Sequence, residues 1–177
     1  MSYKGFHDYD EQLTLSNEQY SMQKLDFAKS WLEKLSALDF ESLTEGEKID
    51  YQIIENQLKA SQFYIEEFRS FEWNPSSYNL GGAFFQVINY QKRDLNQRLT
   101  DVSTKLEAVP EYYQTATANL KEVTQVHTEL AIQQLEGSKS MFETKLMDSL
   151  SASTHEAVFK LAFTEKSLRL ASMNILF

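Results

Sequence analysis

The stretch that decides the fold runs from Thr44 to Phe68 and reads TEGEKIDYQIIENQLKASQFYIEEF. Thr44 and Glu47 have the spacing of a capping box, in which each side chain accepts a hydrogen bond from the other residue's backbone N–H. Residues at three- and four-residue steps then share one helix face. They are Ile49, Ile53, Ile54, Leu58, Ser61, Ile65 and Phe68. We expect a helix that buries this mostly apolar face.

A second amphipathic helix is predicted on the N-terminal side of this stretch. Ser16 to Gln19 resembles another capping box, with the Ser16 side chain as the acceptor. The apolar residues that follow recur at helical spacing and predict one buried face. They are Met22, Leu25, Ala28, Leu32 and Leu35, and the helix is expected to end near Leu38.

Further helices are predicted after the Trp73-Asn74-Pro75 break. Leu95, Leu99, Val102 and Leu106 mark a helix that ends at Val109, because the residue before a proline is pushed out of the helical region. Pro110 then suits the first position of the next helix, which we expect to continue to Gly137. Shorter helices are predicted over residues 141–150 and after Ser153. The 83–90 segment is too short for its periodicity to decide whether it is helical.

Composition agrees with an all-α fold. The chain has 177 residues, with five Gly and two Pro, too few for a sheet protein that turns every ten residues or so. We expect one helical domain over residues 1–177, an elongated bundle of about six to seven antiparallel helices. The five residues from Met173 to Phe177 are mostly apolar, which indicates either a docked terminal helix or a chain that is part of a larger protein.

Net charge and hydropathy exclude several classes of partner. The formal charge of −9 disfavours binding to a phosphate backbone, so no nucleic-acid partner is predicted. No stretch has the roughly 18 to 20 apolar residues that a membrane-spanning helix needs, so no transmembrane segment is predicted. Cysteine is absent, which excludes disulfides and thiolate metal sites.

No catalytic or metal-binding residue is predicted for this chain. A helical H-E-x-x-H zinc site needs two histidines four residues apart, yet Phe159 stands where the partner of His155 would be. His7 and His127 are far away in sequence. We expect His127 to pack on a helix face and His155 to be solvated in the first turn of its helix.

A cleft or interface is predicted around the Gly81-Gly82 pair. Glycine lets another backbone approach closely, and loops beside such positions often contact a ligand or a neighbouring domain. The alternative is that the aromatic residues of this region belong to the core. The predicted cleft or interface residues are Trp73, Tyr78, Gly81, Gly82 and Tyr90.

The N-terminal motif Gly5-Phe6-His7-Asp8-Tyr9-Asp10 carries a family resemblance. Together with Asp50-Tyr51, Asn74-Pro75, Val109-Pro110 and the 131–137 segment, in this order, it resembles the N-terminal half of the bacterial family called domain of unknown function 885. Full-length members look like zincin-like metallopeptidases whose zinc motif lies in the C-terminal half. The role of His7, Asp8 and Asp10 in the family motif is left open, with a loop that fixes the first helix as one account.

The resemblance implies a non-catalytic helical region that forms part of the wall or lid of a substrate cleft. It implies no cofactor in this chain and zinc only in the missing C-terminal half. The expected partner is that catalytic half, or another protein chain that covers the apolar C-terminus. A self-standing module that binds a protein or peptide through residues 73–90 is the alternative, and a small ligand-binding bundle is a third. The compartment stays open, with the bacterial envelope or secretion favoured over the cytoplasm.

Overall fold

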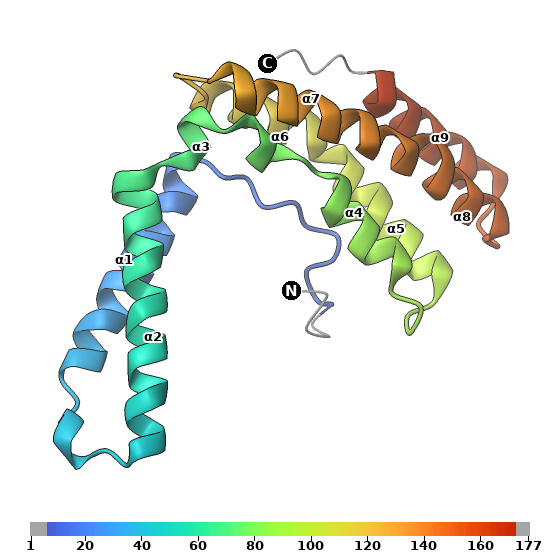
Figure 1. Cartoon of the computed structure of the whole chain (residues 1–177). Helices are drawn as coiled ribbons and strands as arrows, with labels where there is room; N and C mark the ends of the chain where they lie inside the picture. Colours follow the sequence, from blue (N-terminus) through green and yellow to red (C-terminus); the bar gives the residue numbers. More distant parts are fainter. Residues whose placement is uncertain (1–6, 173–177) are drawn as a thin grey trace. The chain divides into compact units, whose positions relative to one another are not determined.

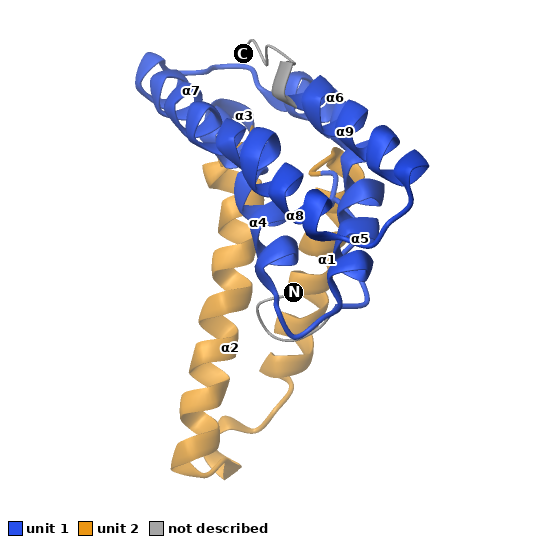
Figure 2. Cartoon of the chain, turned by 90° about the vertical axis from the view of Figure 1, so that its right-hand side faces the viewer, with its two compact units in different colours: residues 1–15, 72–177 blue, residues 16–71 orange. Residues whose placement is uncertain are grey.

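The computed structural model describes residues 7–172, and these residues form helices without any strand (Figure 1). The predicted all-α class is confirmed. The chain divides into two compact units, unit 1 with residues 1–15 and 72–177 and unit 2 with residues 16–71 (Figure 2). The prediction of one domain over the whole chain stays a prediction. The apolar end at 173–177 lies outside the described residues.

Unit 2 is a hairpin of two long helices, α1 (Glu18–Ser36) and α2 (Glu45–Phe63), joined through the short 3-10 helix η2 (Phe40–Ser42). The predicted capping box at the start of α2 is confirmed. Glu47 Oε2 accepts from the backbone N–H of Thr44 at 2.8 Å, and Thr44 Oγ1 accepts from that of Glu47 at 3.4 Å. At α1 the cap is Asn17 rather than Ser16, because the Asn17 side chain accepts from the backbone N–H of Tyr20.

The apolar stripe of α2 is helical but is not buried as predicted. Ile49 and Ile53 keep 58% and 54% of their surface exposed, and Ile54 is exposed as well. On α1, Ala28 is buried whereas Met22 is exposed. Two helices can cover only the faces they turn toward each other, so a hairpin leaves part of its apolar surface uncovered.

The C-terminal end of α2 continues as one π-helical turn, η3 (Tyr64–Phe68). Arg69 ends this turn in the left-handed region, with φ 45°, and its backbone N–H donates to the carbonyl of Tyr64. The short helix α3 (Ser70–Trp73) follows. The helical path thus ends at Phe68, the last residue of the stretch that predicts this helix, because the left-handed residue after it stops the path.

Unit 1 contains a segment of extended chain and turns over residues 7–15 and a series of helices. Gly81 to Asn89 is helical, which decides the segment that the sequence left open. The elements are η4 (Pro75–Tyr78), α4 (Gly81–Asn89), α5 (Leu95–Glu107), α6 (Val109–Asn119), α7 (Gln125–Ser140), the π-helical turn η5 (Met141–Lys145), α8 (Leu146–Ala152) and α9 (Ala157–Ser172).

The core of unit 1 lies between α4, α5, η5, α8 and α9. The predicted apolar positions of α5 are buried, as Leu99 and Val102 are fully enclosed. Phe84 of α4 packs edge-on against Phe142, with ring centroids 5.2 Å apart. This packing fixes α4 against η5, which positions the groove described below.

The predicted helix from Pro110 to Gly137 is two helices. The break over residues 120–124 has no Gly or Pro to announce it. Instead Thr124 caps α7, with Oγ1 accepting from the backbone N–H of His127, and the backbone N–H of Lys121 donates to the carbonyl of Glu72. Gly137 does not end a helix, since α7 runs past it into η5. In the described part of the chain, no helix is both long and apolar enough to cross a membrane.

Candidate functional site

Two residues of the N-terminal motif, His7 and Asp10, belong to a largely buried charged cluster within unit 1. Asp10 is 3% exposed, and its Oδ2 atom lies 2.7 Å from His7 Nδ1 and 3.0 Å from Arg93 Nη1. The same Arg93 atom donates to Asp101 Oδ2 at 2.6 Å. The cluster therefore ties the segment before α1 to the loop after α4 and to α5.

The ring of Tyr90 covers the other side of this cluster. Its centroid lies 4.0 Å from that of His7, in a tilted arrangement. His7 Nε2 is buried and has no hydrogen-bond partner in the part of the chain that is described. Asp8, by contrast, is exposed. Two of the three motif residues are thus held in the cluster, and one faces solvent.

Charges in the cluster balance one another. Burial disfavours the charged guanidinium of Arg93, but the hydrogen bonds and charges of Asp101 and Asp10 outweigh it, so the pKa of Arg93 is raised. Lys105, one helical turn beyond Asp101, is only 6% exposed. Burial lowers the pKa of Lys105, and the negative charges of Asp10, Asp101 and Glu11 oppose that shift in part.

The cluster does not fit a zinc ion. Asp10 Oδ2 already meets His7 and the fixed cation of Arg93, whose charge would repel a metal at the same oxygen. Across the described residues, no three His, Asp or Glu side chains gather closely enough to hold a metal ion. The arrangement can fasten residues 7–10 to the loop after α4 and to α5, whereas the account of the motif as a loop that fixes the first helix stays a prediction.

A layer of tyrosines fills the interior beside η4 and α6. Tyr78 is 3% exposed, and its hydroxyl accepts from Asn119 Nδ2 at 3.1 Å. The rings of Tyr78 and Tyr112 meet edge to face, as do those of Tyr112 and Tyr113. Tyr78, predicted for the cleft, is therefore part of the core.

This layer predicts a loss of stability in alkali. Burial raises the pKa of Tyr112 to about 12, and burial raises that of Tyr113 as well. A phenol whose pKa is raised by folding contributes stability below its unfolded value, about 10, and that stability is lost as pH rises through about 12. The free energy of unfolding in urea should fall over this interval. Tyr112→Phe should reduce this decrease in the free energy of unfolding with pH. Tyr9→Phe, at an exposed position, should leave the decrease unchanged. The same decrease in both variants would show that the Tyr112 phenol does not cause it.

The remaining aromatic and histidine predictions fall elsewhere in unit 1. Trp73 meets His127 edge to face at 4.9 Å, so His127 packs against an aromatic ring as expected of a helix-face residue. His155 is partly buried, whereas a solvated residue was predicted. It stacks on Phe159 at 3.8 Å, and its Nε2 lies 2.9 Å from the carbonyl oxygen of Asn96. The helix α9 begins only at Ala157, which leaves His155 in the preceding loop.

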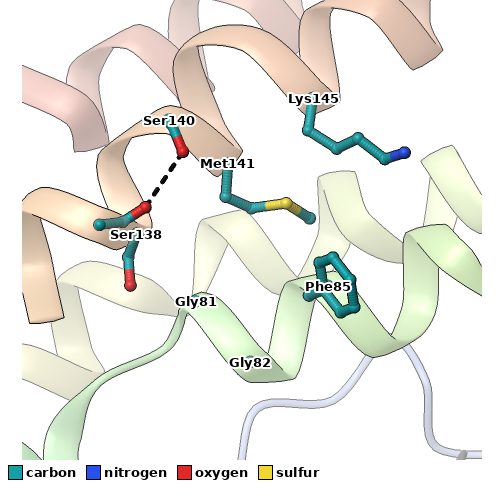
Figure 3. Close-up of a pocket in the computed structure, with 8 residues that line it drawn as sticks. Gly81, Gly82, Phe85, Ser138, Ser140, Met141 and Lys145 are labelled. Carbon is teal, nitrogen blue, oxygen red and sulfur yellow. Dashed lines mark hydrogen bonds between the residues drawn. The ribbon is translucent and has the colours of Figure 1, made fainter.

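An open groove of about 430 Å³ lies between α4 and the junction of α7 with η5 (Figure 3). Gly81 and Gly82 line it from α4, and Gly137 from α7. Met141 and Phe85 extend into the space between these elements from opposite sides (Figure 3). The other lining residues are Ser138, Ser140 and Lys145. Two of the five predicted cleft residues, Gly81 and Gly82, thus meet in one groove, whereas Trp73, Tyr78 and Tyr90 do not line it.

The three glycines of the groove differ in what surrounds them. A Cβ atom on Gly81 would lie 2.3 Å from Ser138 Oγ and 2.8 Å from Ser138 Cβ, so glycine is needed there for α4 to approach α7. A Cβ atom on Gly82 or Gly137 would meet nothing within 4 Å. Ser138 Oγ also lies 2.9 Å from Asn79 Oδ1, which accepts from the backbone N–H of Gly81.

Comparison with known proteins gives a family and a solved relative. Residues 1–171 match the family described as "Bacterial protein of unknown function (DUF885)". A solved chain from Shewanella oneidensis, described as a candidate lipoprotein of unknown function, is 36% identical and superposes on 98% of this chain with a TM-score of 0.88. The match spans 32% of that solved chain, about a third of its length. No curated protein matches the chain.

Proposed function

This chain belongs to the bacterial family of unknown function DUF885, and we propose that it is the non-catalytic N-terminal helical region of a zinc-dependent, peptidase-like protein. In this proposal its helices form part of the wall or lid of a substrate cleft. The zinc ligands and the catalytic groups would come from the C-terminal half of the complete protein. The observation that carries the proposal is that a relative at 36% identity holds the same fold as one third of a longer chain.

Uncovered apolar surface in unit 1 supports a further polypeptide beside this one. Val158, Leu161 and Leu168 fall on one face of α9, and Val158 is 78% exposed. The opposite face of the same helix is packed, since Phe163 and Ser167 are fully buried. Apolar side chains in a continuous row on a helix face mark a surface that another element covers.

Unit 2 supports the proposal by itself in the same way. Phe27 and Trp31 stand one turn apart on α1 and are both exposed. On α2 and η3, Phe63, Tyr64 and Phe68 form an exposed aromatic group with centroids 5.4 to 6.2 Å apart. A helical hairpin with aromatic groups on its outer surface is suited to pack into a larger helical protein.

The lipoprotein description of the relative supports a place in the bacterial envelope for this chain as well. A self-standing module that binds proteins or peptides is the second candidate, and the open groove beside Gly82 and Gly137 favours it. The two candidates differ in what the groove serves. In the first it belongs to a substrate cleft, and in the second it is the whole binding site.

The proposal predicts a chain without its own peptidase chemistry. The purified 177-residue chain is incubated with zinc and passed through a desalting column. Elemental analysis should then find much less than about one equivalent of zinc per chain. The chain should also leave a mixed peptide library uncut, with or without added zinc. About one equivalent of retained zinc together with cleavage that a chelator stops would overturn the proposal.

A further inference from the structure

We propose that the groove between α4 and the α7–η5 junction binds a short, extended peptide segment that carries an apolar side chain next to a carboxylate. The identification of this peptide as a substrate rests on the proposed function. Its binding to the groove does not, because every residue that lines the groove belongs to the described part of this chain.

The glycines give the first argument. Gly137 lies in the interior of α7, where glycine is less favourable than alanine because it loses more conformational freedom on folding. Packing explains Gly81 but not Gly82 or Gly137, since the space above both is open. Open backbone on two sides of one groove lets another main chain approach more closely than any side chain would allow.

Charge gives the second argument. The groove is lined by one cation, Lys145, and by no Asp or Glu, although the chain as a whole carries a net charge of −9. Lys145 makes no ion pair within residues 7–172, whereas nearby Lys139 is 3.4 Å from Glu143. A ligand with a carboxylate would therefore complement the groove.

Shape gives the third argument. Phe85 is 55% exposed at the groove, and Met141 faces it from η5. Met141 and Lys145 are four residues apart in the same π-helical turn, so an apolar contact and a cation lie side by side. A volume of about 430 Å³ is at the lower end for ligand sites. Two turns of a helix, ~10–12 Å in diameter and about 11 Å long, take up a larger volume than this. An extended segment of a few residues fits these limits.

The test compares peptides on the purified chain by fluorescence anisotropy. The probe is a labelled, end-blocked peptide with the core Ala-Phe-Glu-Ala, and the matched peptides carry Gln or Lys in place of Glu. The Glu peptide should bind about fivefold more tightly than the Gln peptide, and the Lys peptide should bind most weakly. Raising the salt concentration should reduce the difference.

Matched variants locate the site. Gly137→Ala should weaken binding about fivefold or more while the melting temperature stays unchanged or rises, a combination that misfolding cannot produce. Gly46→Ala is its control, because a Cβ atom there also meets nothing within 4 Å and Gly46 is outside the groove. Lys145→Glu should abolish the preference for the Glu peptide, and Lys92→Glu, an exposed lysine outside the groove, should keep it.

Three results would overturn the inference. One is that none of the peptides binds. Another is that neither Gly137→Ala nor Lys145→Glu changes the affinity for the Glu peptide. The third is self-association of the chain that Gly137→Ala abolishes, which would make a second copy the occupant. None of these results depends on the outcome of the zinc and cleavage test. Peptide binding in the groove and the proposed function can therefore be disproved independently.

Discussion

Asp10→Ala should lower the free energy of unfolding by about 3 kcal/mol, which is one of the two largest effects expected for a single substitution outside the apolar core. The Asp10 carboxylate meets His7 and Arg93 inside the protein. Removing it leaves a partly buried guanidinium with one carboxylate partner instead of two. The effect should stay at the lower end of the range for buried pairs, because Arg93 keeps contact with water and with Asp101.

Urea unfolding followed by circular dichroism measures this loss. Asp8→Ala is the matched control, since it changes the same residue type two positions away in the same motif and Asp8 is exposed. That control should stay within about 0.5 kcal/mol of the parent chain. If the two substitutions cost the same, the charged cluster does not fasten the N-terminal segment, and the structural role given to the motif is wrong.

Gly81→Ala should cost about 1–3 kcal/mol, even though alanine is the better helix former. The new methyl group would overlap Ser138, and moving Ser138 would disturb its contact with Asn79 Oδ1, which in turn accepts from the backbone N–H of Gly81. Gly82→Ala, at the next position, meets open space and should be neutral or slightly stabilising. The opposite signs at adjacent glycines are the expected result.

A double-mutant cycle makes this prediction specific. Ser138→Gly removes the two nearest atoms that a methyl group on residue 81 would strike and leaves only Asn79 Oδ1, at 3.2 Å, as a tight contact. In the Ser138→Gly background, Gly81→Ala should therefore lose most of its cost, with a coupling energy of about 1 kcal/mol or more. Equal costs in both backgrounds would show that the approach of α4 to α7 does not depend on glycine at position 81.

Local signals predicted the helices well. The Thr44 capping box, the apolar positions of α5 and the break at Val109-Pro110 all follow from contacts within a few residues, which periodicity and capping rules describe. The sequence does not predict the break after Asn119, because apart from the Thr124 cap it depends on a backbone hydrogen bond from Lys121 to Glu72, 49 positions away in the chain. A break made by tertiary contact has no breaker residue to announce it.

The candidate site was predicted only in part, for the same physical reason. Asp10 and Arg93 are 83 positions apart, so their pairing could not be read from spacing. One sequence signal does indicate a buried charged cluster. Arg98, Asp101 and Lys105 recur at helical steps beside the apolar stripe of α5, and charged residues at such half-buried positions need partners of opposite charge. The Gly81-Gly82 pair did point to the groove. Gly137, where the sequence predicts the end of a helix, lies inside α7 and lines the groove.

This chain is expected to bind a peptide without cleaving it. Native mass spectrometry of the chain, incubated with zinc, desalted and then mixed with the Ala-Phe-Glu-Ala peptide, tests binding, metal content and cleavage in one spectrum. The account predicts the mass of the chain with one intact peptide and no retained zinc. A chain that holds zinc beside shortened peptide products would contradict it.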